Sequence, residues 1–367
     1  MRLLPLAVLA ILLPGCAGQA GVNMQPVAQR QAFVLAGVRN VTQVSQLTGP
    51  DSPNRTGRFA VAGQDLGSMF HAGGRTWFVF GDTFGSRSPG MVGGGGGNWR
   101  SNALAYTTDR NPVDGIRLDG YIVDSTHWAK ELLPAKQVDG VEITVIPTYG
   151  FAAGGAMYLD YMSVRHWGQP GRWETNYSGL ARSTDGGRTW TKLASPRWPG
   201  NSNFVQVSVA HVRGDLYFWG VTHGRFGGVK LMKVAERDVE HQGAYRYFAG
   251  VDAAGAPRWS PNMAAARTVA KGTVGELSVV WNPYLERWLM TSSDGASTNA
   301  VIREGIAPWG PWSEPSTLVS QADVPGLYAP YMSPEYTTNH GRTIYFTLSK
   351  WGPYNVFWYR ADLVRKR

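Results

Sequence analysis

Short runs in which apolar and polar residues alternate recur along the chain with a common layout. Each instance has a turn rich in glycine, aspartate or arginine, a run of aromatic and β-branched residues, a polar loop and a second such run. Alternation with period two predicts strands, and glycine-rich turns between them predict antiparallel pairing. The predicted pairs are 74–80 with 102–106, 155–159 with 178–182, 214–219 with 229–234, 286–290 with 299–303, and 341–346 with 355–359.

A further strand is predicted ahead of each pair, and these innermost strands would line a central channel. They are 65–70, 145–151, 204–212, 276–281 and 329–336. Tryptophan-centred outer strands are predicted at 189–191, 258–260 and 311–313, and segment 33–47 is expected to complete the last repeat and close the ring. The sequence therefore predicts an all-β fold, a five-bladed β-propeller, over residues 33–367.

The composition agrees with many short strands in one large domain. The chain has 46 Gly, 22 Pro and 15 Trp, and no Pro/Ser-rich linker or block of charge divides it. The net charge is +9, but Lys and Arg are scattered singly apart from 365–367. This pattern favours a solvated surface attracted to anionic envelope polymers over a nucleic-acid interface. We expect a monomer that does not bind nucleic acid.

The N-terminal residues resemble a bacterial lipoprotein signal. Met1 and Arg2 precede an apolar run too short to span a bilayer comfortably, which ends at Pro14, Gly15 and Cys16, the only cysteine. We expect residues 1–16 to be a signal peptide with its lipobox and residues 17–32 to be a tether. The protein would then be exported and anchored through Cys16 to the outer face of a bacterial membrane, in the cell envelope. The alternative is a buried structural cysteine.

Residues 183–190 form an Asp-box, a hairpin turn in which aspartate and glycine set the backbone and a tryptophan packs beneath it. The motif supports a propeller and says little about catalysis, so Asp185 is interpreted as structural. Glu335 is likewise assigned to structure, because it lies near the far end of its innermost strand.

Two aspartates are predicted to meet at the mouth of the channel. Counting outwards from the first hairpin puts Asp65 level with about 80–82, and therefore with Asp82. The same register in the fourth repeat gives Glu276 the place of Asp65, so Glu276 is a third candidate catalytic acid at the same mouth. Alternative roles are an Asx turn for Asp82, a strand cap for Asp65, and a channel-lining role for Glu276.

Loops expected at the same mouth carry aromatic rings and hydrogen-bond donors, which suit sugar faces and hydroxyls. The candidate substrate-binding residues are Trp99, Arg100, Asn102, His166, Trp167, Gln206, His223, Arg225, Tyr331 and Trp351. The glycine run 93–97 is not a phosphate loop, because no Gly-Lys-Ser/Thr follows it. The seven histidines show no metal-ligand spacing. We expect no metal and no cofactor.

Glycoside hydrolases use a pair of carboxyl groups. A protonated acid assists departure of the leaving oxygen, and a carboxylate acts as base or nucleophile. Mutual repulsion raises the pKa of one partner and keeps its proton near neutral pH. A serine hydrolase is not indicated, because no Gly-x-Ser-x-Gly motif precedes a helix.

The ordered motifs resemble a bacterial family long described as a domain of unknown function, whose members are endo-D-arabinanases. The motifs are Gly-Gln-Asp-Leu-Gly (63–67), Phe-Gly-Asp-Thr-Phe-Gly (80–85), Asn-Trp-Arg-Ser-Asn (98–102), Gly-Glu-Leu-Ser-Val-Val-Trp-Asn-Pro-Tyr (275–284) and Tyr-Ala-Pro-Tyr-Met-Ser-Pro-Glu-Tyr (328–336). The resemblance covers roughly 39–363. It implies a five-bladed propeller that cuts the α-D-arabinofuranan of arabinogalactan and lipoarabinomannan, with inversion, through catalytic aspartates at Asp65 and Asp82.

Two other classes remain open. A non-catalytic glycan-binding propeller would keep the aromatic residues and be indifferent to the carboxyl groups. A sialidase-like hydrolase would explain the Asp-box, but such enzymes carry several boxes, six blades and an arginine cluster. The linkage cut and the endo or exo mode stay undetermined at this stage.

Overall fold

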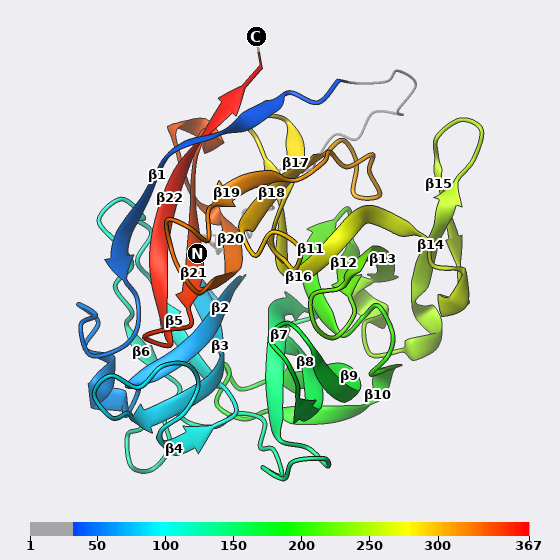
Figure 1. The fold of residues 1–367 in the computed structure, drawn as a ribbon. Coiled ribbons are helices and arrows are strands. Elements are labelled where there is room, and N and C mark those ends of the chain that lie inside the picture. The colour runs from blue at the N-terminus through cyan, green and yellow to red at the C-terminus, as the bar shows by residue number, and fades with distance from the viewer. Residues whose placement is uncertain (1–31, 367) are drawn as a thin grey trace, which may run out of the picture.

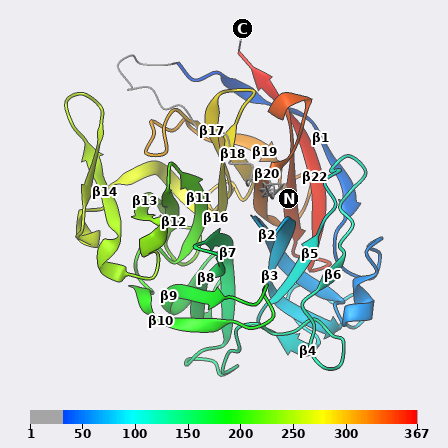
Figure 2. The ribbon, with the colours of Figure 1, turned by 180° about the vertical axis from the view of Figure 1, so that it is seen from behind.

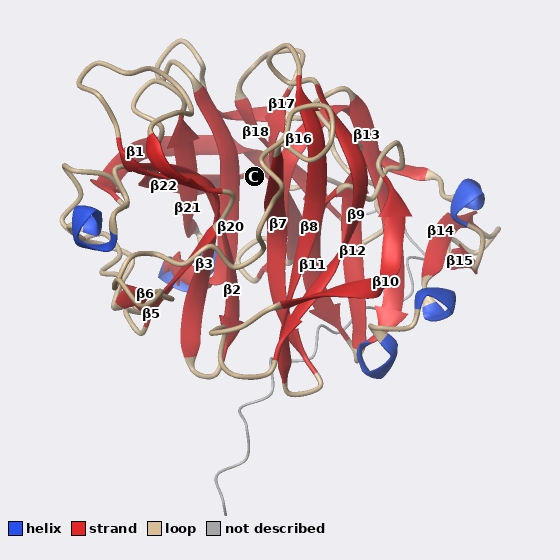
Figure 3. Ribbon diagram, turned by 90° about the horizontal axis from the view of Figure 1, so that it is seen from below, coloured by secondary structure: helices blue, strands red, loops and turns tan. Residues whose placement is uncertain are grey.

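The computed structural model describes residues 32–366, which form an all-β structure. The expectations for the signal, Cys16 and most of the tether lie outside the described residues. Helical segments within 32–366 are short 3-10 turns, which Figure 3 shows at the margins of the strands. None of the helices in this part is long and apolar enough to cross a membrane. The turns are η1 (Thr56–Phe59), η2 (Glu236–Asp238), η3 (Gln242–Ala244), η4 (Met263–Ala265) and η5 (Asn339–Gly341).

The strands of residues 32–366 form four hydrogen-bonded antiparallel sheets, one of which holds nine strands, and are described below as five groups in chain order, with that large sheet divided between the third and the fourth. The first contains β2 (Gly63–Ala72), β3 (Arg75–Ser86), β5 (Ala103–Thr107) and β6 (Gly120–Tyr121), with β4 (Gly97–Arg100) paired to β3. The second contains β7 (Thr144–Ala153), β8 (Ala156–Trp167), β9 (Trp173–Ser183) and β10 (Thr191–Pro199). The third contains β11 (Gln206–Val212), β12 (Asp215–Val221), β13 (Gly227–Ala235), β14 (Arg246–Val251) and β15 (Pro257–Ser260).

The fourth group contains β16 (Thr268–Asn282), β17 (Arg287–Asp294), β18 (Ala300–Gly305) and β19 (Ser316–Val319). The fifth contains β20 (Leu327–Thr338), β21 (Thr343–Lys350), β22 (Asn355–Arg365) and, from the other end of the domain, β1 (Leu35–Gln46). The pairing of β1 with β22 confirms that segment 33–47 completes the last repeat. Because β1 covers the outer edge of β22, that edge is not left unpaired.

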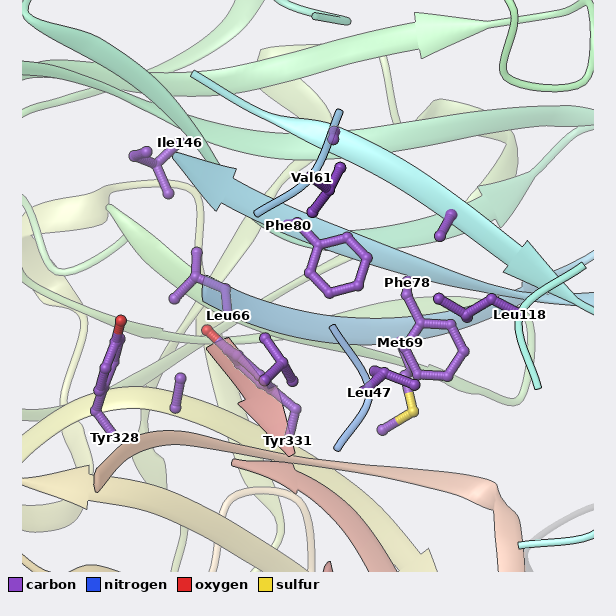
Figure 4. Packing of buried hydrophobic residues seen from close by; sticks show 14 of the residues in the cluster. Leu47, Val61, Leu66, Met69, Phe78, Phe80, Leu118, Ile146, Tyr328 and Tyr331 are labelled. Atoms are coloured by element: carbon purple, nitrogen blue, oxygen red, sulfur yellow. The ribbon is translucent and has the colours of Figure 1, made fainter. Parts of the chain in front are cut away.

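The groups surround a common centre in a propeller-like arrangement (Figures 1 and 2). Their innermost strands, β2, β7, β11, β16 and β20, contact one another in chain order, and β20 returns to β2. Four of the five apolar clusters in the described part of the chain lie between two neighbouring groups, and the fifth joins the first and last groups and also includes residues of the second. Figure 4 shows part of the cluster that joins the first and last groups, in which Leu66 lies near Tyr331 and Tyr328. Burial of this apolar surface is the main force that holds the ring together.

Two of the three predicted outer strands are wrong. Trp190 lies in the turn before β10, and its indole N–H donates a hydrogen bond to the Gly187 carbonyl. Trp312 makes only an isolated bridge to Gly305, and the outer strand of the fourth group is β19. In both places the tryptophan packs beneath a turn instead of pairing in a ladder, a choice that residue propensity does not reveal.

The third group also departs from the expected pattern. Segment 258–260 is a strand as expected, but β15 pairs with β14 in a protruding hairpin that the sequence analysis missed. Next to this hairpin β13 pairs with β16, so the third and fourth groups share one continuous sheet.

The Asp-box forms the turn between β9 and β10. The Asp185 carboxylate accepts hydrogen bonds from the backbone N–H and the hydroxyl of Thr189, at 3.0 and 2.6 Å. These donors lower the pKa of Asp185 to about 2. Asp185 therefore organises a surface turn, as the motif indicates.

Candidate active site

A bulge in the first hairpin brings Asp65 and Asp82 together. Gln64 pairs with Thr83 and Leu66 with Phe80, so Asp65 alone faces the two residues 81 and 82 on β3. A second irregularity follows at once, where Leu66 has a φ of +67°. Bulges turn side chains out of the regular alternation and are common beside functional sites. Here the bulge directs both carboxyl groups to one face of the hairpin, as the register predicts.

The absence of a side chain at Gly81 makes room for the Asp65 carboxyl group in this geometry. A Cβ atom there would lie 2.5 Å from Oδ1 of Asp65, closer than any side chain tolerates. The Asp65 carboxyl group therefore rests directly over the backbone that carries Asp82.

A cavity of about 820 Å³ opens above the pair. Asp65, Asp82 and Glu276 all line it, although they come from the first and fourth groups. Its volume lies within the ~300–1,000 Å³ range of ligand sites in proteins. The three acids named from the sequence thus share one cavity.

The pKa of Asp65 is raised to about 8. Burial contributes most, and the negative charges of Asp82 and Glu276 add to it. The hydroxyl of Tyr328 donates a hydrogen bond of 2.9 Å to Oδ2 of Asp65, which acts in the opposite direction together with Tyr354. Asp65 therefore keeps its proton at neutral pH.

The pKa of Asp82 is raised to about 7, also chiefly by burial. Two donors oppose this effect: the Thr144 hydroxyl at 2.6 Å and the Trp99 indole N–H at 2.8 Å, both to Oδ1. Because its pKa is the lower of the two, Asp82 is the better stabilised of the two aspartates as an anion.

Glu276 differs from both aspartates because a cation neutralises it. Arg225 donates from Nε to Oε2 at 2.9 Å and from Nη2 to Oε1 at 2.7 Å. Burial alone would raise the pKa of Glu276, but the charge and hydrogen bonds of Arg225 outweigh it and hold that pKa below its ordinary value. Glu276 is ionised and has no proton to donate.

Residues 51–360 match the family described as Domain of unknown function (DUF4185). The chain belongs to the DUF4185 family. Notoamide biosynthesis cluster protein J of Aspergillus sp. (strain MF297-2) is 28% identical to it over 334 residues, which is 85% of each chain. Notoamide biosynthesis cluster protein J' of Aspergillus versicolor is 26% identical over 339 residues, 85% of this chain and 87% of the other.

Several solved structures share the architecture of this DUF4185 protein. A protein from Bacteroides ovatus matches with a TM-score of 0.55 at 13% identity, covering 94% of this chain and 97% of the other. An exo-β-1,3-galactanase from Phanerochaete chrysosporium gives 0.53 at 8% identity over 89% and 64%. A GH43_1 enzyme from Xanthomonas citri gives 0.50 at 12% identity over 89% and 90%. At such identities the likeness concerns the fold alone.

Six of the predicted substrate-binding residues line the cavity of the DUF4185 chain. They are Trp99, Trp167, Gln206, Arg225, Tyr331 and Trp351. Trp167 and Trp351 are 41% and 52% exposed, so the rings of both can stack on a sugar.

Four of the predicted residues are not among those that line it. Arg100 is buried and donates to the carbonyls of Ala129 and Ala60. The Asn102 amide is fully buried and fastens the backbone around residues 132–133 and 145. His166 contacts Asp139 at the surface, and His223 contacts the Gly200 carbonyl through Nδ1. Their positions in loops between strands led us to expect them at the mouth of the channel. In the structure they form hydrogen bonds with backbone carbonyls or with surface groups instead.

The sequence analysis missed three groups that contact the aspartates: Thr144, Tyr328 and Tyr354. Tyr328 begins the motif at 328–336, and Tyr354 ends the aromatic loop 350–354, so a signal existed for both. Thr144 gives no signal, because only the packing of the second group against the first brings it to Asp82. Within 32–366 no set of three or more His, Cys, Asp or Glu side chains is arranged to hold a metal ion.

Proposed function

We propose that this DUF4185 protein is a glycoside hydrolase that cleaves α-D-arabinofuranosyl linkages in cell-envelope arabinan. The observation that carries the proposal is the pair of coupled carboxyl groups, both with raised pKa, in one cavity walled by aromatic rings. Two such acids supply both proton transfers that glycoside hydrolysis needs. The arabinan specificity rests on the ordered motifs of the sequence.

In the proposed mechanism Asp65 is the general acid and Asp82 the general base. Asp65 gives its proton to the glycosidic oxygen as the bond from that oxygen to the anomeric carbon breaks. A water molecule attacks the anomeric carbon from the opposite face and passes a proton to Asp82. The product then has inverted configuration, and both carboxyl groups return to their initial states when Asp82 passes a proton to solvent and Asp65 regains one.

In this proposal Glu276 is an electrostatic support and not a third proton donor. Its negative charge is one of the causes that raise the pKa of Asp65. Arg225 holds the carboxylate in place and also lies 5.5 Å from the ring centre of Tyr328, whose hydroxyl bonds Asp65. The Arg225–Glu276 ion pair thus connects the fourth group of strands, through Tyr328, to Asp65 on the first.

The proposal includes a five-bladed propeller. Its support is the chain-order contact of β2, β7, β11, β16 and β20 and the return of β20 to β2. The likeness to propeller-like hydrolases agrees with this arrangement.

The direct test is incubation of the purified protein with arabinogalactan, followed by sizing of the products. Release of arabinose-containing oligosaccharides supports the proposal. Binding of the polymer without any release would replace it with a glycan-binding role.

The rate should depend on pH as a narrow bell. Catalysis requires ionised Asp82 and protonated Asp65, so kcat/KM should rise with pH up to about 7 and fall above about 8. Glu276→Gln removes a charge that raises the pKa of Asp65, so its alkaline limb should move to lower pH. Reducing-sugar assays from pH 4 to pH 10 measure both profiles, and an unmoved limb would contradict the electrostatic role of Glu276.

We further propose that Cys16 anchors the protein to the outer face of a bacterial membrane. Cys16→Ser should release the protein from the membrane fraction, because a lipid cannot be attached without the thiol. Fractionation with a high-salt wash measures the effect. Retention of the variant on membranes after that wash would remove the lipid anchor from the proposal.

A further inference from the structure

A second, smaller cavity of about 240 Å³ adjoins the first. The two cavities share Arg225, Thr298, Leu327 and the turn 170–172 between β8 and β9. Phe226, Thr273 and Asp294 line only the smaller one. Its volume is below the ~300–1,000 Å³ of sites for drug-sized ligands, which suits a single sugar ring.

The walls of this side cavity are held in place without a ligand. The backbone N–H of Arg225 donates to the Gly171 carbonyl at 2.9 Å, which ties the turn to the third group of strands. A Cβ at Gly295 would lie 2.0 Å from the Arg225 carbonyl oxygen, so these two backbones are in direct contact. The Asp294 carboxylate accepts the Thr273 hydroxyl at 2.8 Å and the Ser297 hydroxyl at 2.6 Å. A preformed cavity spares a ligand the cost of ordering it.

The charges that border the side cavity balance. Arg225 is neutralised by Glu276, while Arg172 and the ionised Asp294 carry opposite charges. A phosphate or carboxylate ligand would be attracted by the positive charge of Arg172 and repelled by the negative charge of Asp294. The balance favours an uncharged polar ligand.

The lining combines one apolar platform with unused hydrogen-bond capacity. Phe226 is 38% exposed. The guanidinium of Arg172 lies over its ring, 5.1 Å from the centre, and the His223 ring packs edge-on against it, with 5.3 Å between the ring centres. Within residues 32–366 that guanidinium makes no hydrogen bond or ion pair, so its N–H donors face solvent or a ligand. An aromatic ring beside free donors matches the apolar face and the hydroxyls of a sugar.

We infer that the side cavity binds one uncharged sugar residue that branches from the glycan chain in the main cavity. This inference rests on the proposed function and adds a preference for branched substrate. The main cavity already extends between the walls that carry Trp351 and Trp167, with the aspartates among its lining residues. A substituent on that chain can enter the side cavity past Arg225 and Leu327.

The test compares two synthetic α-arabinofuranosyl oligosaccharides: a linear hexasaccharide and the same chain with one arabinofuranosyl branch. Wild type should show about tenfold higher kcat/KM on the branched substrate, equivalent to about 1.4 kcal/mol. Phe226→Ala and Arg172→Ala should bring this ratio close to one. Phe226→Tyr should keep it, because the ring remains. A melting curve for each variant checks that it is folded.

Arg58→Ala is the matched control, because Arg58 is also exposed, lies 4.7 Å from the ring centre of Phe59 and lines neither cavity. It should leave the ratio unchanged. Equal kcat/KM of wild type on both substrates overturns the inference, and so does an equal gain from a linear heptasaccharide. Failure of wild type to bind or cleave either oligosaccharide would instead overturn the proposed function.

Discussion

Replacing Asp65 or Asp82 with asparagine is expected to lower arabinan cleavage at least about a thousandfold, roughly 4 kcal/mol of transition-state stabilisation. Asparagine keeps the shape of the side chain but can neither donate the proton of Asp65 nor accept one in place of Asp82. Reducing-sugar release from arabinogalactan at pH 7.5 measures the loss. Retention of more than about a tenth of the activity by either variant would refute the assignment of the pair.

Measuring the stability of each variant distinguishes a loss of catalysis from a loss of folded protein. The pKa values of Asp65 and Asp82 are raised above the ordinary 3.8, so the folded state disfavours their ionised forms. Wild type therefore loses stability as pH rises from about 4 towards 8, by up to about 1.4 kcal/mol per pH unit for each group. Each asparagine variant lacks the share of this loss that comes from the aspartate it replaces, so its melting temperature should match wild type at pH 4 and exceed it at pH 8.

Asp185→Asn is the control for these variants. Asp185 organises the Asp-box turn and lies outside the residues that line the cavity. Asparagine there should cost stability with a modest effect on rate, the reverse of the catalytic variants.

Replacing Arg225 with methionine is expected to destabilise the protein by about 3 kcal/mol or more. Glu276 is only 6% exposed, and the variant leaves its charge without the cation that neutralises it. Burial then raises the pKa of Glu276 above its ordinary 4.5, so the folded state binds the proton more tightly than the unfolded state. The stability deficit should therefore grow as pH rises, and denaturant unfolding at pH 5 and pH 8 measures it.

Two controls accompany the arginine variant. Arg110→Met removes an exposed pair with Glu335, in which the arginine side chain is 64% exposed, and should cost less than about 1 kcal/mol. Adding Glu276→Gln to Arg225→Met should recover part of the stability and abolish the added pH dependence. A deficit that is equal at pH 5 and pH 8 would show that Glu276 is not the uncompensated charge.

The sequence by itself determined the innermost strands, their order and the meeting of the two aspartates. Strand periodicity is a local property, so β2, β7, β11, β16 and β20 fall where alternation and turns predict them. The first hairpin is also local, and counting from its turn sufficed to place Asp65 level with about 80–82, where the structure has it opposite 81 and 82. The joining of β1 to β22 followed from the need to cover an edge.

Only the tertiary structure decided what each side chain at the mouth contacts. Thr144 reaches Asp82 from the second group, Tyr328 reaches Asp65 from the fifth, and Arg225 reaches Glu276 from the third to the fourth. In the same packing, Arg100 and Asn102 donate hydrogen bonds to backbone carbonyls and do not line the site. Burial and the charges across these contacts set the pKa values, and they depend on distances between strands that no local pattern encodes.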